Sequence, residues 1–223
     1  MKNLIQYLPL THPKATMRFM KRLNDAGVMS ILDLEDSAQD PFDEAKTSEL
    51  KISSRNHFLE IAKNTSWKSE DFRLPIFVRV NDMSTSFFEE DIKTIIEISK
   101  TKFPINGIFL PKVSAYEDIT NTSDLLSFTD HPIEIVPMIE TKVGMENLES
   151  LLAADTSQKF TKIHYGHFDY ALDADLWPFP DPNHKFFWNH ITPMIELIHK
   201  YNKTYIHTPF PFPKNSDLFW SSS

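Results

Sequence analysis

Short apolar segments alternate with longer helix-forming segments along the whole chain, and this alternation constrains the fold more than any other feature. Several of the short segments are apolar on both faces, among them ILDL, PIFVRV, GIFLP and IEIVPMI. A strand that helices cover on both faces shows such continuous apolarity, whereas a half-exposed strand alternates polar and apolar residues. The predicted strands are Leu4–Leu8, Ser30–Asp36, Pro75–Asn81, Gly107–Val113, Ile133–Thr141, Lys162–Asp169 and Thr204–Thr208.

Amphipathic segments between these strands predict helices. They include Glu44–Lys63, Phe88–Lys100, Gly144–Ala154 and Phe186–Tyr201. Strands that alternate with helices indicate an α/β fold with a parallel sheet, and both a barrel and an open doubly wound sheet fit the pattern. The chain has no GxGxxG or GxxxxGK[ST] motif and only 4 glycines, which argues against a dinucleotide or P-loop site.

We expect one domain over residues 1–223, because no linker, repeat or second core is visible in the sequence. The proline-rich segment Trp177–His184 is expected to be an ordered loop. The predicted seventh strand is followed only by a short aromatic-rich tail, so a barrel built from this chain is expected to be truncated after that strand.

Charge and cysteine content exclude several classes of function. The formal net charge is -8 and no basic patch stands out, so we expect neither a nucleic-acid partner nor an anionic membrane partner. The absence of cysteine excludes disulfides, thiolate zinc sites and a cysteine nucleophile. No apolar run approaches the roughly 18–20 residues that span a bilayer, and the N-terminus does not resemble a signal peptide. We therefore expect a soluble, cytoplasmic protein.

Polar side chains follow the predicted strands where each strand ends. The carboxyl ends of parallel strands meet on one face of a barrel or at one edge of an open sheet, which is where such folds carry their functional groups. Carboxylates with an arginine and a lysine at these ends predict a metal site for an anionic ligand. The residues concerned are Glu35, Asp36, Arg79, Lys112, Glu140 and Asp169.

The chemistry of Mg²⁺ suggests a role for each of these groups. Mg²⁺ prefers oxygen ligands and keeps several waters, so Glu140 and Asp169 would suffice as direct ligands. Glu35 and Asp36 could hold metal-bound waters, and the planar fork of Arg79 suits a substrate carboxylate. A metal bound to a 2-oxo acid stabilises the enolate that forms when the adjacent carbon–carbon bond breaks.

Each assignment has a structural alternative. Arg79 could instead form an ion pair with Glu35 or Asp33, and Lys112 could brace the mouth of a barrel rather than bind substrate. A transition-metal site that uses His164 and His167 is a further alternative.

Five segments stand out in order along the chain. They are ILDLEDS at Ile31–Ser37, VRVN at Val78–Asn81, GIFLPKVSAYED at Gly107–Asp118, MIETKVGMEN at Met138–Asn147 and YGHFDYALDADL at Tyr165–Leu176. In order and spacing these segments resemble the citrate lyase β-subunit/malyl-CoA lyase/HpcH–HpaI aldolase family.

The resemblance implies a TIM-type (β/α)₈ barrel that binds Mg²⁺, or Mn²⁺ in its place, and acts as a carbon–carbon lyase or aldolase. It places the metal ligands at Glu140 and Asp169, the substrate-binding arginine at Arg79, and the acidic support of the metal waters at Glu35 and Asp36. The implied substrates are 2-oxo acids, hydroxy acids or CoA thioesters. The implied assembly is a homo-oligomer, a trimer or hexamer.

The chain departs from the family pattern at three places. The segment NLIQYLPLTHP lacks the family's basic residue, Phe168 stands where an acidic residue is common, and an eighth strand with its C-terminal lid is expected to be missing. These departures put CoA-thioester substrates in doubt more than metal binding. They leave open a catalytically degenerate barrel that serves as a non-catalytic or regulatory subunit, and a lyase for phosphoenolpyruvate-like or sugar acids.

Overall fold

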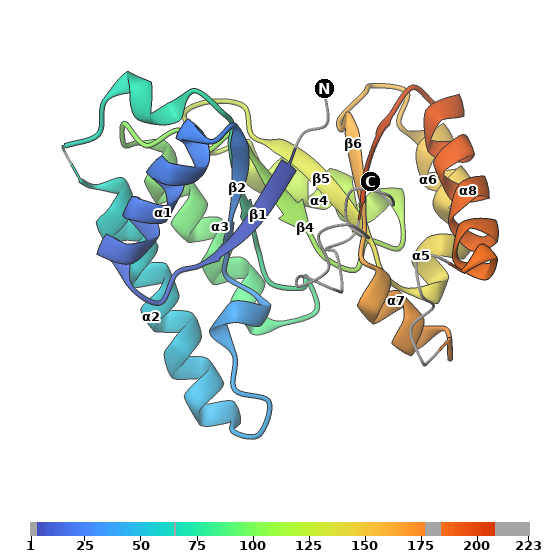
Figure 1. Ribbon diagram of the computed structural model, residues 1–223, viewed down its shortest axis with the longest axis horizontal. Coiled ribbons are helices and arrows are strands. Elements are labelled where there is room, and N and C mark those ends of the chain that lie inside the picture. Colours follow the sequence, from blue (N-terminus) through green and yellow to red (C-terminus); the bar gives the residue numbers. More distant parts are fainter. Residues whose placement is uncertain (1–3, 65, 177–183, 208–223) are drawn as a thin grey trace. The chain divides into compact units, whose positions relative to one another are not determined.

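The computed structural model describes residues 4–64, 66–176 and 184–207, and Figure 1 shows their arrangement into helices and strands. Contacts divide the chain into two compact units. The N-terminal unit comprises Met1–Pro111 and Asn121–Ile135, and the C-terminal unit comprises Lys112–Thr120 and Val136–Ser223. The predicted single domain over residues 1–223 stays a prediction.

Four parallel strands form the sheet of the N-terminal unit, and they pair in chain order. The register pairs Asp33 with both Pro9 and Arg79, so polar groups at the strand ends come side by side. Its strands are β1 (Leu4–Pro9), β2 (Val28–Asp33), β3 (Ile76–Arg79) and β4 (Gly107–Leu110). Its helices are α1 (Pro13–Asp25), α2 (Glu44–Ala62) and α3 (Ser86–Ser99), with short 3₁₀ turns η1 (Asp36–Ala38) and η2 (Ser69–Phe72).

Local sequence signals explain where these helices begin. Pro13 occupies the start of α1, where its missing N–H leaves no hydrogen bond unmade. Asp43 caps α2, because its carboxylate accepts a hydrogen bond from the backbone N–H of Lys46 at 3.0 Å. Figure 1 shows α1 and α2 packed together beside β1 and β2. The strands of this unit supply fully buried side chains such as Ile31 in β2 and Val78 in β3.

The C-terminal unit is built on strands that are again parallel and paired in chain order. These strands are β5 (Glu134–Ile139), whose last four residues belong to this unit, β6 (Lys162–Tyr165) and β7 (Thr204–Ile206). Its helices are α5 (Lys142–Glu146), α6 (Leu148–Ala154), α7 (His167–Asp173) and α8 (Lys185–Lys200), and α4 (Tyr116–Leu126) contributes residues to both units. The buried ammonium of Lys203 links the segment before β7 to the segment between α6 and β6. Its Nζ donates to Asp155 Oδ2 at 2.6 Å and to the carbonyl of Phe160 at 2.7 Å.

The predicted strands all exist, but most of them end earlier than expected. Asp36 begins η1 and Asp169 lies in α7, so neither is part of a strand as predicted. The reason is that the apolar run stops before the polar residues, which leave the ladder to form turns. The predicted helix Gly144–Ala154 is two helices that meet at Asn147. Thr208 and residues 177–183 of the predicted loop lie outside the described residues.

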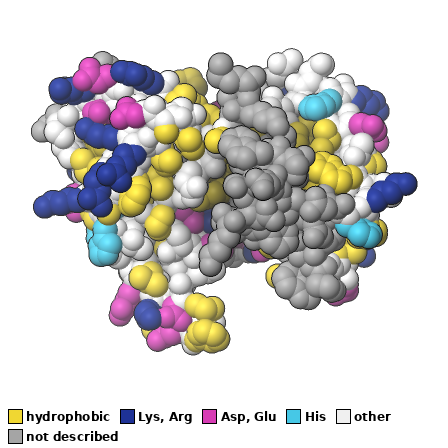
Figure 2. Space-filling view, in the orientation of Figure 1, with side chains coloured by type: hydrophobic (Ala, Val, Ile, Leu, Met, Phe, Trp, Pro, Cys, Tyr) yellow, Lys and Arg dark blue, Asp and Glu magenta, His cyan; other side chains and the backbone are white. Residues whose placement is uncertain are grey.

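Charged side chains of both signs share the surface that Figure 2 displays. Several form exposed ion pairs, such as Lys63 with Glu97 and Lys93 with Glu90, which contribute little to stability. Within the part of the chain that the structure describes, none of the helices has the length and apolarity needed to cross a bilayer.

Candidate functional site

Arg79, the last residue of β3, lies at the centre of an ionic cluster in the N-terminal unit. Its Nε and Nη2 donate to Asp33 Oδ1 and Oδ2 at 2.8 and 2.7 Å, which is a bidentate pair. Its Nη1 lies 2.9 Å from both Glu35 Oε2 and Asp36 Oδ2. The ring of Tyr7 lies 4.8 Å from the guanidinium carbon, within the range of a cation–π contact. We call these five residues the Arg79 cluster.

Interactions within the Arg79 cluster keep both Arg79 and Asp33 ionised. Burial alone would lower the pKa of Arg79, but its hydrogen bonds and the charges of Asp33, Glu35 and Asp36 raise that pKa well above its ordinary value. Burial would raise the pKa of Asp33, yet Arg79 and the backbone N–H groups of Glu35 and Ser37 hold it below its ordinary value. The predicted ion-pair alternative for Arg79 is therefore present, with Asp33 as the bidentate partner.

The side chains around the guanidinium differ in their contact with solvent. The exposed fraction is 4% for the Asp33 side chain, 12% for both Glu35 and Arg79, and 57% for Asp36. Asp33 is thus a buried anchor, whereas Asp36 is an outer partner. The sequence left open Glu35 or Asp33 as the ion-pair partner of Arg79, and the strand register, which only the structure gives, aligns Asp33 with Arg79.

Glu140 follows β5 in the C-terminal unit and is 3% exposed. Its Oε1 accepts a hydrogen bond from the backbone N–H of Lys112 at 3.0 Å. Lys112 adopts the left-handed backbone conformation, with φ at 52°, which is uncommon for a residue that carries a side chain. The backbone of Lys112 therefore has a defined role next to Glu140, and the predicted substrate-binding role of its ammonium stays a prediction.

Gly166, just after β6, leaves the space that the Glu140 side chain occupies. A Cβ atom at position 166 would lie 2.2 Å from Glu140 Oε2 and 2.6 Å from Glu140 Cβ, which is closer than real atoms approach. The backbone N–H of Gly166 also donates to the carbonyl of Ile139 at 3.0 Å. Lys112, Glu140 and Gly166 together form what we call the Glu140 cradle. The sequence pattern pointed to Glu140 but missed Gly166.

Asp169 is the acidic residue in the first turn of α7, three residues after Gly166. Its side chain is half-buried. A carboxylate at this position also interacts favourably with the positive end of a helix dipole. The structure thus brings Asp169 into the same unit as the Glu140 cradle, on a helix rather than at the end of a strand.

The two carboxylates that the sequence predicts as Mg²⁺ ligands, Glu140 and Asp169, both lie in the C-terminal unit. Among the described residues there is no group of three or more histidine, aspartate and glutamate side chains that could hold a metal ion. Mg²⁺ needs only one or two direct carboxylates, so Glu140 and Asp169 are a compatible pair. The same finding covers the histidine-based alternative, since histidine belongs to the residue types considered, and the ring of His167 stacks on Phe187 with centroids 5.1 Å apart.

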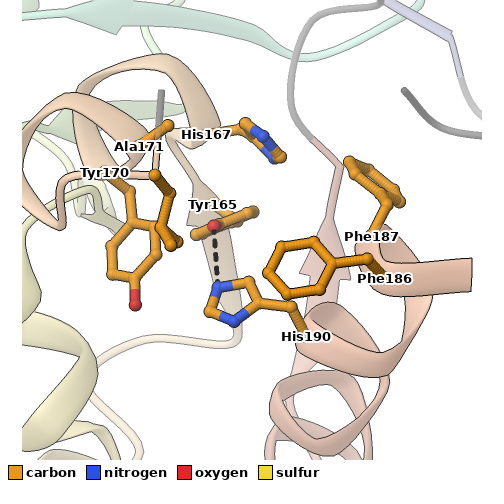
Figure 3. A pocket seen from close by; sticks show the side chains of 8 residues that line it. Tyr165, His167, Tyr170, Ala171, Phe186, Phe187 and His190 are labelled. Carbon is orange, nitrogen blue, oxygen red and sulfur yellow. Dashed lines mark hydrogen bonds between the residues drawn. The ribbon is translucent and has the colours of Figure 1, made fainter. Parts of the chain in front are cut away.

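An aromatic hollow lies between α7, α8 and the end of β6, and Figure 3 shows the side chains that line it pointing toward one another. The hydroxyl of Tyr165 is 3.4 Å from His190 Nε2, and Tyr170 stacks on His190. The hollow encloses about 10 Å³, which is room for roughly one water molecule. It is therefore too small to bind a metabolite.

Parallel strands that alternate with helices and carry buried charged groups just beyond their carboxyl ends define an α/β protein of the barrel type. The chain belongs to the HpcH/HpaI aldolase/citrate lyase family, whose model matches residues 4–180. The resemblance of the five sequence segments to this family is confirmed.

Two curated relatives match parts of this chain. The chain is 28% identical over 155 residues to the malyl-CoA/beta-methylmalyl-CoA/citramalyl-CoA lyase of Chloroflexus aurantiacus, a match that covers 60% of this chain and 43% of the relative. It is 30% identical over 80 residues to human mitochondrial citramalyl-CoA lyase, covering 33% of this chain and 23% of the relative. The chain therefore aligns with less than half the length of these two curated relatives.

A solved structure supports the fold class. The chain superposes on the protein CitE from Mycobacterium tuberculosis, crystallised in complex with magnesium and pyruvate, with a TM-score of 0.68 and 16% identity. The superposition covers 98% of this chain and 78% of CitE. The predicted α/β barrel-type fold is thereby confirmed, and the open doubly wound sheet is set aside.

Proposed function

We propose that the protein is a Mg²⁺-dependent carbon–carbon lyase of the aldolase type that acts on a 2-oxo acid, a hydroxy acid or an acyl-CoA-derived substrate. Family membership supports the lyase class, because the two curated relatives are lyases of CoA esters. The CitE crystals with magnesium and pyruvate support a small carboxylic acid as the ligand type. The predicted use of CoA and the predicted homo-oligomer, a trimer or hexamer, stay predictions.

The observation that carries the proposal is the Glu140 cradle. A buried carboxylate is stable only where donors or a cation offset its lost hydration. One oxygen of Glu140 accepts a hydrogen bond from the Lys112 N–H, and the second fills the space that the absent side chain of Gly166 leaves for it. We assign Glu140 and Asp169 as the residues that hold Mg²⁺. When bound, Mg²⁺ supplies a Lewis acid that stabilises the negative charge that develops on the substrate oxygen as the carbon–carbon bond breaks.

Arg79 is proposed to receive the substrate carboxylate through Nη1. Asp33 occupies Nε and Nη2 from a buried position. Glu35 and Asp36 both lie 2.9 Å from Nη1, and of these two side chains that of Asp36 is 57% exposed and that of Glu35 12%. An exposed ion pair contributes little free energy, so a substrate carboxylate can replace Asp36 without disturbing Asp33. The further role predicted for Glu35 and Asp36, support of metal-bound waters, stays a prediction.

Calorimetric titration tests the metal assignment. Wild-type protein is titrated with Mg²⁺ and then, at saturating Mg²⁺, with pyruvate. Glu140→Gln and Asp169→Asn should each weaken Mg²⁺ binding by about tenfold or more, since each loses a charged oxygen ligand. Glu149→Gln is the matched control, because Glu149 is an exposed carboxylate on α6 that pairs with Lys200, and it should bind Mg²⁺ as wild type does.

The outcomes separate the enzyme from the alternative of a non-catalytic subunit, which the occupied fork of Arg79 favours. Two results together support lyase activity: binding of Mg²⁺ and pyruvate, and release of a cleavage product such as pyruvate from a panel of hydroxy acids and CoA esters. Failure of the wild type to bind either probe, or unchanged Mg²⁺ binding by Glu140→Gln, would show that the site assignment is wrong.

A further inference from the structure

A buried lysine on α2 contacts the turn that carries the acidic residues of the Arg79 cluster. Lys51 is 3% exposed. Its Nζ donates to the carbonyl of Leu34 at 2.9 Å and to the carbonyl of Glu35 at 2.6 Å. These two carbonyls belong to successive residues, at the point where the chain leaves β2 and turns into η1. Lys51 is therefore attached to the backbone of this turn, and the sequence pattern had not singled it out.

The same turn is fixed from its other side by Asp33. The carboxylate of Asp33 accepts hydrogen bonds from the backbone N–H of Glu35 at 3.0 Å and of Ser37 at 3.1 Å. The N–H groups of the turn thus point to an anion and its carbonyls point to a cation. We call residues 33–37, held in this way, the acidic turn.

Neighbouring side chains complete the support of the acidic turn. The Leu34 carbonyl also accepts from Asn81 Nδ2 at 3.0 Å, and Asn81 in turn donates to Asp91 Oδ2 at 2.7 Å. Arg55, one helical turn after Lys51 on α2, pairs with Asp91 Oδ1 at 3.0 Å. Groups from α2, α3 and the residues after β3 therefore converge beneath one short stretch of backbone.

Keeping an ammonium in this position has an energetic cost. Burial lowers the pKa of Lys51, and the charges of four carboxylates oppose that change; they are Glu35, Asp91, Asp33 and Asp36. A buried cation is tolerated when carbonyl or carboxylate oxygens replace its water shell. A methionine at this position would fill the same volume without the charge. A lysine here therefore costs more folding free energy than an apolar residue would, unless its N–H donors stabilise the turn.

We propose that Lys51 is a positioning residue that holds the acidic turn in the conformation from which Glu35 and Asp36 reach Arg79. By holding the turn it sets the orientation of the guanidinium and of Nη1, the atom that receives the substrate carboxylate. The ligand-binding consequence rests on the function proposed for Arg79. The effect on the turn itself does not.

Lys51→Met and the matched control Lys203→Met test this proposal. Lys203 is also buried and also donates from Nζ to a carboxylate and a carbonyl, but in the C-terminal unit. Native-state hydrogen exchange is followed at the amides of Leu34, Glu35, Ser37 and Ala38. Exchange there should become about tenfold faster or more in Lys51→Met, after correction for any change in global stability, and should stay within about twofold of wild type in Lys203→Met. Lys51→Arg, which keeps donors and charge, should restore most of the protection.

Ligand titration separates this proposal from the proposed function. With Mg²⁺ saturating, the Kd for pyruvate should rise about tenfold in Lys51→Met while the Kd for Mg²⁺ stays within about twofold. Unchanged hydrogen exchange in the acidic turn of Lys51→Met would overturn the positioning role, regardless of the Kd values for Mg²⁺ and pyruvate. Faster exchange in a protein whose wild type binds neither Mg²⁺ nor pyruvate would uphold the positioning role and reject the proposed function. If Lys51→Met does not fold, wild-type-like exchange in Lys51→Gln, which lacks the charge, overturns the proposal, and fast exchange there supports it.

Discussion

The Arg79 cluster and the Glu140 cradle hold buried charge in different ways. In the cluster, side chains of opposite charge attract one another: a guanidinium is surrounded by three carboxylates and an aromatic face. In the cradle, a carboxylate is positioned by a backbone N–H and by the absence of a side chain at Gly166. The first arrangement depends on residue charge, and the second depends on backbone conformation.

This difference implies that the two regions respond differently to substitution. Removal of Arg79 from the cluster leaves Asp33 buried without its counter-charge, so the main consequence is lost stability. A change in the cradle moves or neutralises one carboxylate, so the main consequence is altered binding of a cation. The expected effects are largest for loss of the Arg79 charge, smaller for filling the Glu140 cradle and smallest for a change of pH.

The largest effect is expected when the cluster loses its cation. Arg79→Met should lower the free energy of unfolding by about 3–5 kcal/mol, because Asp33 would remain buried and ionised without a counter-charge. Urea denaturation at pH 7 measures this, and Glu140→Gln, which neutralises a carboxylate of the cradle without changing its shape, should cost clearly less. The double variant Arg79→Met/Asp33→Asn should recover part of the loss. Equal costs for Arg79→Met and Glu140→Gln would remove the contrast between the two regions.

A smaller effect on stability, with a specific effect on binding, is expected when the cradle is filled. Gly166→Ala places a methyl group where Glu140 Oε2 lies, so the carboxylate must move, at a cost of about 1–3 kcal/mol. Mg²⁺ affinity measured by calorimetry should fall by about tenfold or more. Gly107→Ala is the matched control, since its Cβ would meet Glu134 O at 2.6 Å within the N-terminal unit. That variant should lose stability and keep wild-type Mg²⁺ affinity; a similar loss of affinity in both variants would contradict the assignment.

The smallest effect concerns pH and distinguishes the two units. Burial lowers the pKa of His167 to about 3 and also lowers the pKa of His190 and His207. The ring of His167 is neutral in the folded protein at pH 5 and takes up a proton in the unfolded protein below about pH 6.5, so the unfolded state binds more protons and stability falls as the pH decreases from 6.5. The loss between pH 7 and pH 5 should be about 1–2 kcal/mol for His167.

Urea denaturation at pH 7, 6 and 5 measures this loss, and His167→Phe should flatten the dependence while the ring still packs on Phe187. Arg79 and Asp33 both stay ionised over this interval because their pKa values lie farther from neutrality than usual. An unchanged slope in His167→Phe would show that this histidine is protonated in the folded protein.

The strands and the chemical nature of the site could be read from the sequence because both depend on local pattern. Short apolar segments, several of them apolar on both faces, identified the strands, and the polar residues at their ends identified Arg79 and Glu140. The ends of the strands could not be placed, because the hydrophobic pattern does not show where a chain leaves the ladder. Asp36 and Asp169 were placed in strands for this reason, although they lie in η1 and α7.

The sequence pattern could not identify the residues that support the site, Lys51 and Gly166. Lys51 is buried on the inward face of α2, where a lysine would ordinarily be expected at the surface. Its partners are carbonyls sixteen and seventeen residues away in sequence, and the residues around Lys51 give no sign of them. Gly166 is likewise explained only by the side chain of Glu140, which belongs to a different strand–loop connection.

The sequence by itself determined the α/β class, the family and the residue types available for chemistry, because periodicity, strand-end polarity and motif order are properties of the chain. Tertiary structure alone decided that Asp33 grips Arg79, that a left-handed Lys112 offers its N–H to Glu140, and that Lys51 lies under the acidic turn. The physical reason is that hydrogen bonds and ion pairs depend on distance and direction between groups far apart in the chain, and only packing of the strands and helices sets those.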